Sequence, residues 1–66
     1  MEILINGETK LLSAPLSVAA LLRHLNLQGD RVAIELNRQI VRRDQWSATE
    51  LQDKDRLEIV QFVGGG

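Results

Sequence analysis

The residues best suited to chemistry stand at the end of the chain, in Val63-Gly64-Gly65-Gly66. Glycines carry no side chain, so the reactive group they offer is the α-carboxylate, whose reference pKa of roughly 3.3 to 3.7 leaves it ionised at neutral pH. A run without Cβ atoms fits a narrow channel, and three extended residues reach on the order of 10 Å. The carboxylate is therefore a candidate substrate. A frayed end or cloning scar is the alternative, although the apolar segment upstream runs into the glycines without a linker.

Other side chains offer weaker candidates for chemistry. His24 is the single histidine, and the chain contains no cysteine, which excludes disulfides, thiolate metal sites and a thiol nucleophile. Asp53, Asp55 and Glu58 lack the loop spacing of a calcium site, so we interpret them as a solvated turn that could contribute to the choice of partner. We predict no catalytic residue and no metal site in this chain, which would take part in catalysis only as something acted upon.

The overall charge argues against a nucleic-acid partner. The net charge is −1, whereas nucleic-acid binding depends on many Lys and Arg contacts to phosphates. Arg38, Arg42 and Arg43 form the one basic cluster, close to Trp46, but no further aromatic residues are interleaved with it. No apolar run approaches the roughly 20 residues that span a bilayer, and a signal peptide is not evident. We expect a cytoplasmic protein that binds neither membrane nor nucleic acid.

The hydrophobic pattern predicts five strands and one helix. Asn6-Gly7 favours a tight hairpin turn, and Asn37-Arg38 is a second candidate turn. Ser17 is a good helix N-cap, after which apolar residues recur with helical spacing as far as Leu25. Asn26 and Gly29 offer left-handed stops. The expected strands are 1–5, 8–12, 32–36, 39–41 and 56–63, and the segment 42–51 is expected to be irregular or a single helical turn anchored by Trp46 and Leu51.

This order of elements predicts an α+β fold with a mixed five-stranded sheet and the helix on one face. The helix supplies the crossover that a parallel pairing of the first and last strands requires. One helix covers one face, and side chains alternate along a strand. If Ile3 and Leu57 point at the helix, then Leu4, Val60 and Phe62 point away. We predict that these three form an exposed partner-binding patch; the alternatives are cover by the Trp46 segment or scattered surface residues without function.

The sequence also resembles a known family. Leu36-Asn37-Arg38-Gln39-Ile40-Val41, followed by Arg43 and Trp46, and the ending from Asp55 to Gly66 are similar to the sulfur carrier proteins of thiamin biosynthesis, the ThiS family. The resemblance covers essentially the whole chain. It implies a ubiquitin-like β-grasp domain over residues 1–63 and a flexible glycine tail over residues 64–66. Arg42 stands where the family usually has proline and Lys54 where it usually has glycine, so both departures concern turn shape.

The resemblance implies a carrier and not an enzyme. A separate adenylyltransferase, using ATP and magnesium that this chain does not itself bind, would activate the Gly66 carboxylate. Sulfur from a donor such as a cysteine desulfurase would then give a thiocarboxylate, which delivers sulfur to thiazole synthase. Gly64 and Gly65 would thread into the partner. The alternatives are a carrier of the molybdopterin synthase type, a ubiquitin-like protein modifier, and a binding module whose glycines do nothing.

Overall fold

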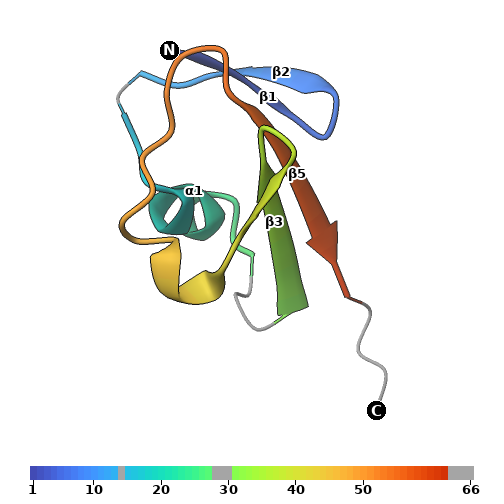
Figure 1. The fold of residues 1–66 in the computed structure, drawn as a ribbon. Coiled ribbons are helices and arrows are strands. Elements are labelled where there is room, and N and C mark those ends of the chain that lie inside the picture. Colours follow the sequence, from blue (N-terminus) through green and yellow to red (C-terminus); the bar gives the residue numbers. More distant parts are fainter. Residues whose placement is uncertain (14, 28–30, 63–66) are drawn as a thin grey trace.

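The computed structural model describes residues 1–13, 15–27 and 31–62, and its elements arise from the segments that the pattern predicts (Figure 1). Within these residues lie five strands, one α-helix and one 3-10 helix. They are β1 (Glu2–Ile5), β2 (Glu8–Leu11), α1 (Val18–His24), β3 (Val32–Leu36), β4 (Gln39–Val41), the 3-10 helix η2 (Arg43–Gln45) and β5 (Arg56–Gln61). The predicted order and the single helical turn after residue 42 are confirmed.

The strands form one mixed sheet in the order β2-β1-β5-β3-β4. β1 pairs with β5 in parallel, and the other three pairings are antiparallel. A parallel pair needs a long crossover connection, and α1 lies within it. The predicted pairing of the first and last strands is therefore confirmed, and β5 takes the central place in the sheet.

The hydrophobic core lies between α1 and one face of the sheet (Figure 1). Ile3, Ile34 and Leu57 are at most 2% exposed, so these strands bury alternate side chains beneath the helix. Trp46 and Leu51 join this core from the segment after η2, as predicted. The indole nitrogen of Trp46 donates to the carbonyl of Val41 at 2.8 Å, which satisfies its one polar atom.

The ends of α1 follow local rules of capping. The hydroxyl of Ser17 accepts a hydrogen bond from the backbone N–H of Ala20 at 3.0 Å, which confirms the predicted N-cap. Asn26 adopts a φ of 60°, and the N–H of Leu27 donates to the carbonyl of Leu22 at 2.9 Å. Together these features form a Schellman motif, in which asparagine takes the place usual for glycine. Gly29, the other predicted stop, lies outside the described residues.

The two predicted hairpin turns have the backbone that their residues favour. Asn6 and Gly7 have φ angles of 48° and 84°, and Asn37 and Arg38 have φ angles of 51° and 71°. Positive φ at both central residues is the mark of a type I′ turn, whose twist matches that of the flanking strands. Asparagine enters this region more readily than most residues, which explains its place in both turns.

The two departures from the family pattern occupy turns that suit the usual residue. Arg42 has φ −67° and ψ 150°, angles that proline also adopts. Lys54 has a φ of 75°, in the left-handed region where glycine avoids the steric cost of a Cβ. Arg42 thus has a backbone that proline could adopt, whereas Lys54 has one that favours glycine and bears the steric cost of its Cβ.

Candidate functional site

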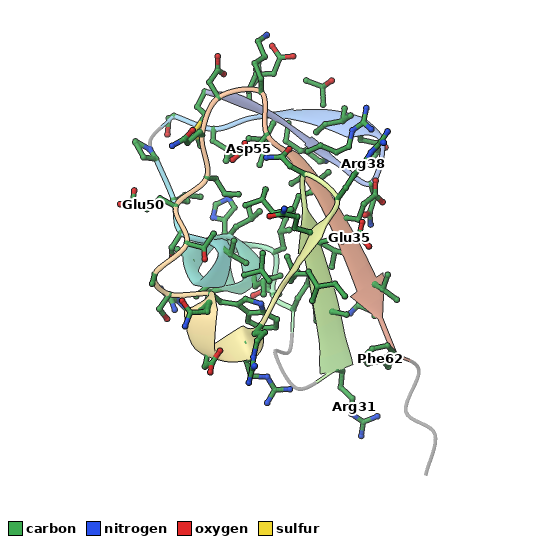
Figure 2. All side chains as sticks on the ribbon, viewed as in Figure 1. Arg31, Glu35, Arg38, Glu50, Asp55 and Phe62 are labelled. Carbon is green, nitrogen blue, oxygen red and sulfur yellow. The ribbon has the colours of Figure 1, made fainter. Side chains whose placement is uncertain are left out.

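The strand that precedes the glycines is held on both sides. β5 contacts β1 through Leu57 opposite Ile5, and it pairs with β3 along its length, from Leu57 opposite Leu36 to Gln61 opposite Val32. The ladder continues beyond the strand, because the N–H of Phe62 donates to the carbonyl of Arg31 at 2.8 Å. The last described residue therefore leaves the sheet from a fixed position, at the end of β5 (Figure 2).

The side chain of Asn6 replaces a missing strand beside the second half of β5. Its carboxamide oxygen accepts the N–H of Ile59 at 2.7 Å, and its carboxamide nitrogen donates to the carbonyl of Ile59 at 3.0 Å. β1 ends at Ile5, so without Asn6 these two backbone groups of β5 would face solvent. The Asn6-Gly7 dipeptide predicted only a turn at Asn6. Nothing in the sequence indicated that the Asn6 side chain also binds the backbone of β5.

A second asparagine fixes the start of β5. The carboxamide of Asn37 accepts the N–H of Arg56 at 2.9 Å and donates to a carboxylate oxygen of Asp55 at 3.0 Å. The other oxygen of Asp55 accepts the N–H of Gln52 at 2.7 Å. Asp53 similarly accepts the N–H of Glu2 at 2.7 Å. The two aspartates of the predicted solvated turn thus bind backbone groups, a role that only the tertiary fold reveals. The placement of Glu58 in the same turn is wrong, because Glu58 lies within β5.

The outer face of the sheet, opposite α1, carries the predicted patch of Leu4, Val60 and Phe62. Val60 and Phe62 are 54% and 56% exposed, and Leu4 is half-buried without packing against the core. Leu4 lies opposite Arg56, so it stands roughly 13 Å along β5 from Val60 at about 3.3 Å per residue. As a binding site the patch stays a prediction, with Leu4 set apart from the other two.

The segment after η2 does not cover Val60 or Phe62. It follows the helix side instead, where the N–H of Val18 donates to the carbonyl of Thr49 and the N–H of Leu51 donates to the carbonyl of Leu16, both at 2.8 Å. The alternative that the Trp46 segment folds over the patch is therefore wrong. The indole of Trp46 is buried in the core beneath α1, where the ring is removed from water.

Other apolar residues accompany Val60 on the outer face. Ala33 lies opposite Val60 in the β3–β5 pair, and Ile40 of β4 is 78% exposed. A shallow hollow of about 130 Å³ lies among Ala33, Ile34, Glu35, Ile40, Glu58 and Val60. Sequence reasoning missed Ile40, because its face depends on the register between β3 and β4.

The remaining candidates stay apart from this face. His24 is exposed and borders a small hollow with Leu11 and Leu16. Arg42 pairs with Asp44 at 3.7 Å, with both side chains exposed. Among residues 1–13, 15–27 and 31–62, no three potential metal ligands are grouped, and no helix has the length and hydrophobicity to cross a bilayer.

The predicted reactive residues lie beyond this geometry. Gly64, Gly65 and Gly66 fall outside the described residues, as does Val63. The structure therefore gives the strand before them and the surface around that strand. Comparison with known proteins does include Val63 and the three glycines, because the model of the ThiS family matches residues 3–66.

The chain belongs to the ThiS family. The sulfur carrier protein ThiS of Escherichia coli K12 is 35% identical to this ThiS family chain over 66 residues, which cover both chains completely. The crystal structure of a thiamine biosynthesis protein (ThiS) from Geobacter metallireducens superposes with a TM-score of 0.86 at 33% identity, again over both whole chains. The resemblance and the predicted fold, a five-stranded mixed sheet with one helix within the described residues, are confirmed.

Some relatives of this ThiS family member are much longer. A thiazole synthase of Paramagnetospirillum magneticum is 42% identical over 66 residues, all of this chain but 20% of that protein. The chain thus spans a fifth of the length of this relative, whereas it matches the Escherichia coli protein from end to end.

Proposed function

We propose that this chain is a sulfur carrier of thiamin biosynthesis whose Gly66 carboxyl group carries the sulfur. The observation that carries the proposal is the family match, which includes all three glycines. The complete alignment with a relative named as a sulfur carrier supports it. Such a chain is not an enzyme, since the reacting group belongs to its own backbone.

The chemistry requires activation of the carboxylate, which is a poor acyl donor. Attack of the Gly66 carboxylate on the α-phosphorus of ATP releases pyrophosphate and gives an acyl-adenylate, in which AMP is a good leaving group. A persulfide sulfur then attacks the acyl carbon and displaces AMP. Cleavage of the resulting S–S bond by a thiol leaves the terminal thiocarboxylate. The adenylyltransferase supplies the nucleotide site and magnesium, and a cysteine desulfurase supplies the sulfur.

This chain contributes position rather than catalytic groups. β5 is paired along both edges near its start and is held by Asn6 and β3 further along. Gly64 and Gly65 thread into the active site of the partner, where a Cβ would collide with the channel wall. Val60 and Phe62 present exposed apolar surface beside the tail, and Leu4 extends this surface toward β1.

Thiazole synthase is the proposed acceptor of the sulfur. Two proteins with that name contain a region similar to this chain, each over 20% of its length. A carrier and its acceptor joined in one polypeptide meet at high effective concentration, so such a fusion supports a working pair. The similarity to regions of thiazole synthases also argues against a carrier of the molybdopterin synthase type, which would deliver sulfur to a different acceptor.

Intact mass spectrometry tests this function. The chain is incubated with ATP, the thiamin-pathway adenylyltransferase, a cysteine desulfurase and a thiol, and the expected product has one oxygen replaced by one sulfur. A ladder of adducts on other proteins would indicate a ubiquitin-like modifier instead. No mass change under conditions that convert the Escherichia coli protein would indicate a binding module.

One additional residue tests the threading of the tail. A variant with alanine added after Gly66 is expected to lose adenylation, because the new side chain and the displaced carboxylate no longer fit the partner. Its melting temperature is expected to match the wild type, which serves as the control for folding. Adenylation of this variant at the native rate would contradict the threading mechanism.

A further inference from the structure

One edge of β5 loses its partner strand before β5 itself ends. On this edge the carbonyl of Leu57 accepts the backbone N–H of Asn6 at 2.9 Å. The backbone groups of a strand return to the same edge at every second residue, so Ile59 is the next to face this side. β1, however, ends at Ile5. The N–H and the carbonyl of Ile59 therefore need partners from outside the strand ladder.

The carboxamide of Asn6 supplies both partners at once. The turn between β1 and β2 lies beside β5 (Figure 1), and from it the Asn6 side chain accepts the N–H of Ile59 at 2.7 Å and donates to the Ile59 carbonyl at 3.0 Å. A type I′ turn accommodates Asn, Asp or Gly at this position. Of these three residues, only asparagine has a side chain that both donates and accepts at neutral pH. The turn alone therefore does not account for the asparagine.

Within the described residues, Asn6 is the last attachment of β5 on this edge. Ile59 lies three residues before Phe62, which is about 10 Å along the strand. Beyond Ile59, the described part of the chain holds β5 from the opposite edge, where the N–H of Phe62 donates to the carbonyl of Arg31 at 2.8 Å. A strand end held on one edge opens more readily than one held on both. The bonds from Asn6 therefore limit the movement of the end of β5.

We infer that Asn6 is a positioning residue for the adenylation of Gly66, because its hold on Ile59 fixes the direction in which the chain continues toward the reacting carboxylate. This inference rests on the proposed function. A group delivered in a fixed direction loses less entropy when it enters the active site of a partner. A displacement of about 1 Å caused far from the chemistry can lower a rate by about 100-fold. Asn6 thus acts through the backbone of β5 and not on the reacting atoms.

Asn37 provides a matched control at the other end of β5. Its φ of 51° is close to the 48° of Asn6, and its carboxamide accepts the N–H of Arg56 at 2.9 Å. Arg56 lies six residues before Phe62, about 20 Å from that end of the strand. Asn6→Gly and Asn37→Gly each remove a carboxamide from β5 and keep a residue that accepts positive φ. Only the first removes the attachment closest to the glycine tail.

The first experiment measures adenylation of the whole chain by the thiamin-pathway adenylyltransferase, with pyrophosphate release as the readout. The temperature is one at which circular dichroism shows every variant to be folded. Asn6→Gly is expected to lower kcat about tenfold and to leave KM within about twofold of the wild type. The reason is that the body of the chain still binds the partner, whereas the carboxylate reaches the reacting position less often. Asn37→Gly is expected to keep both constants within about twofold.

A milder variant, Asn6→Asp, carries the same test if the glycine variant fails to fold. Aspartate suits the turn and keeps an acceptor for the N–H of Ile59, but at neutral pH it has no donor for the Ile59 carbonyl. It is expected to lower kcat about threefold, between the wild type and Asn6→Gly. A wild-type kcat in Asn6→Asp would contradict the role of the carboxamide.

The second experiment follows amide hydrogen exchange by NMR in the free chain, where no partner is needed. In Asn6→Gly the amide of Phe62 is expected to exchange about threefold faster, although its bond to Arg31 lies on the opposite edge of β5. In Asn37→Gly the amide of Arg56 is expected to exchange faster, and that of Phe62 as in the wild type. Unchanged exchange of Phe62 in Asn6→Gly would overturn the inference.

Three kinetic results would also overturn Asn6 as a positioning residue. These are a wild-type kcat in Asn6→Gly, an equal loss of kcat in both glycine variants, and a loss confined to KM, which would indicate direct contact between Asn6 and the partner. Failure of the proposed function has a different signature, which is absence of the sulfur-for-oxygen mass change in the wild-type chain. Faster exchange of Phe62 in Asn6→Gly without that mass change would support the hold of Asn6 on β5 and contradict the sulfur chemistry.

Discussion

The two faces of the sheet carry similar aliphatic residues in opposite surroundings. On β5, Leu57 is completely buried beneath α1, whereas Val60 is 54% exposed on the outer face. Across the sheet, Ile34 is 2% exposed and Ile40 is 78% exposed. The inner face stabilises the fold, because burial of such side chains contributes about 1.5–3 kcal/mol each. The outer face contributes little to folding, and its exposed residues Val60 and Phe62 belong to the patch that we propose as a partner-binding surface.

The largest expected effect lies on the inner face. Leu57→Ala leaves a cavity and is expected to lower the free energy of unfolding by about 2–5 kcal/mol, a large share of what a domain of this size possesses. Urea denaturation followed by circular dichroism measures this loss. The control Val60→Ala is expected to change the free energy by at most about 0.5 kcal/mol. Equal losses of unfolding free energy in the two variants would contradict the conclusion that the inner face stabilises the fold more than the outer face.

The next largest effect is expected at the turn that joins β3 to β4. Asn37→Ala removes the side-chain hydrogen bonds to Asp55 and to Arg56 at the start of β5, and alanine tolerates the positive φ of this position less well than asparagine does. The expected loss is about 1–3 kcal/mol in urea denaturation. Asn37→Gly keeps the turn geometry and isolates the hydrogen bonds, so it should lose less. A glycine variant as unstable as the alanine variant would assign the whole effect to the hydrogen bonds.

A gain in stability is expected at Lys54, which lies on neither face. Lys54→Gly relieves the left-handed backbone at φ 75°, and thermal unfolding is expected to show about 0.5–1 kcal/mol of added stability. The ion pair with Glu2 at 3.3 Å is exposed, so its loss matters little. Lys54→Ala removes the same charge but keeps the strain, and it should show no gain. Equal gains in both variants would contradict the role of the backbone.

The smallest expected effect concerns Arg42. Its φ of −67° and ψ of 150° fit proline, and Val41 before it is already in an extended strand. Arg42→Pro is expected to add about 0.5 kcal/mol by restricting the unfolded chain. Arg42→Ala provides the control and should add nothing. A destabilised proline variant would show that the turn needs the N–H of residue 42.

Local residue chemistry predicted most of the fold. Asn6-Gly7 and Asn37-Arg38 marked both hairpin turns, Ser17 marked the start of α1, and the alternation around Leu57 marked its buried face. Each of these signals acts over a few residues. The observed strands exclude Met1, Leu12 and Phe62, which the predicted limits included. Met1 and Leu12 still exchange hydrogen bonds.

The candidate site was less accessible to such reasoning. The alternation of side chains placed Val60 and Phe62 on the outer face, but it gave no distance to Leu4. That distance depends on the register of β1 against β5, which sets Leu4 opposite Arg56. Ile40 escaped notice for the same reason, since it joins Val60 only through β3.

The sequence by itself determined the family, the glycine tail, the order of the elements and the alternation of buried and exposed residues, because these are properties of neighbours along the chain. The tertiary structure alone decided which distant residues meet. It set Glu35 opposite Glu58, and it turned Asn6 toward Ile59. The physical reason is that strand register arises when the whole sheet packs beneath its helix, and no local signal carries it.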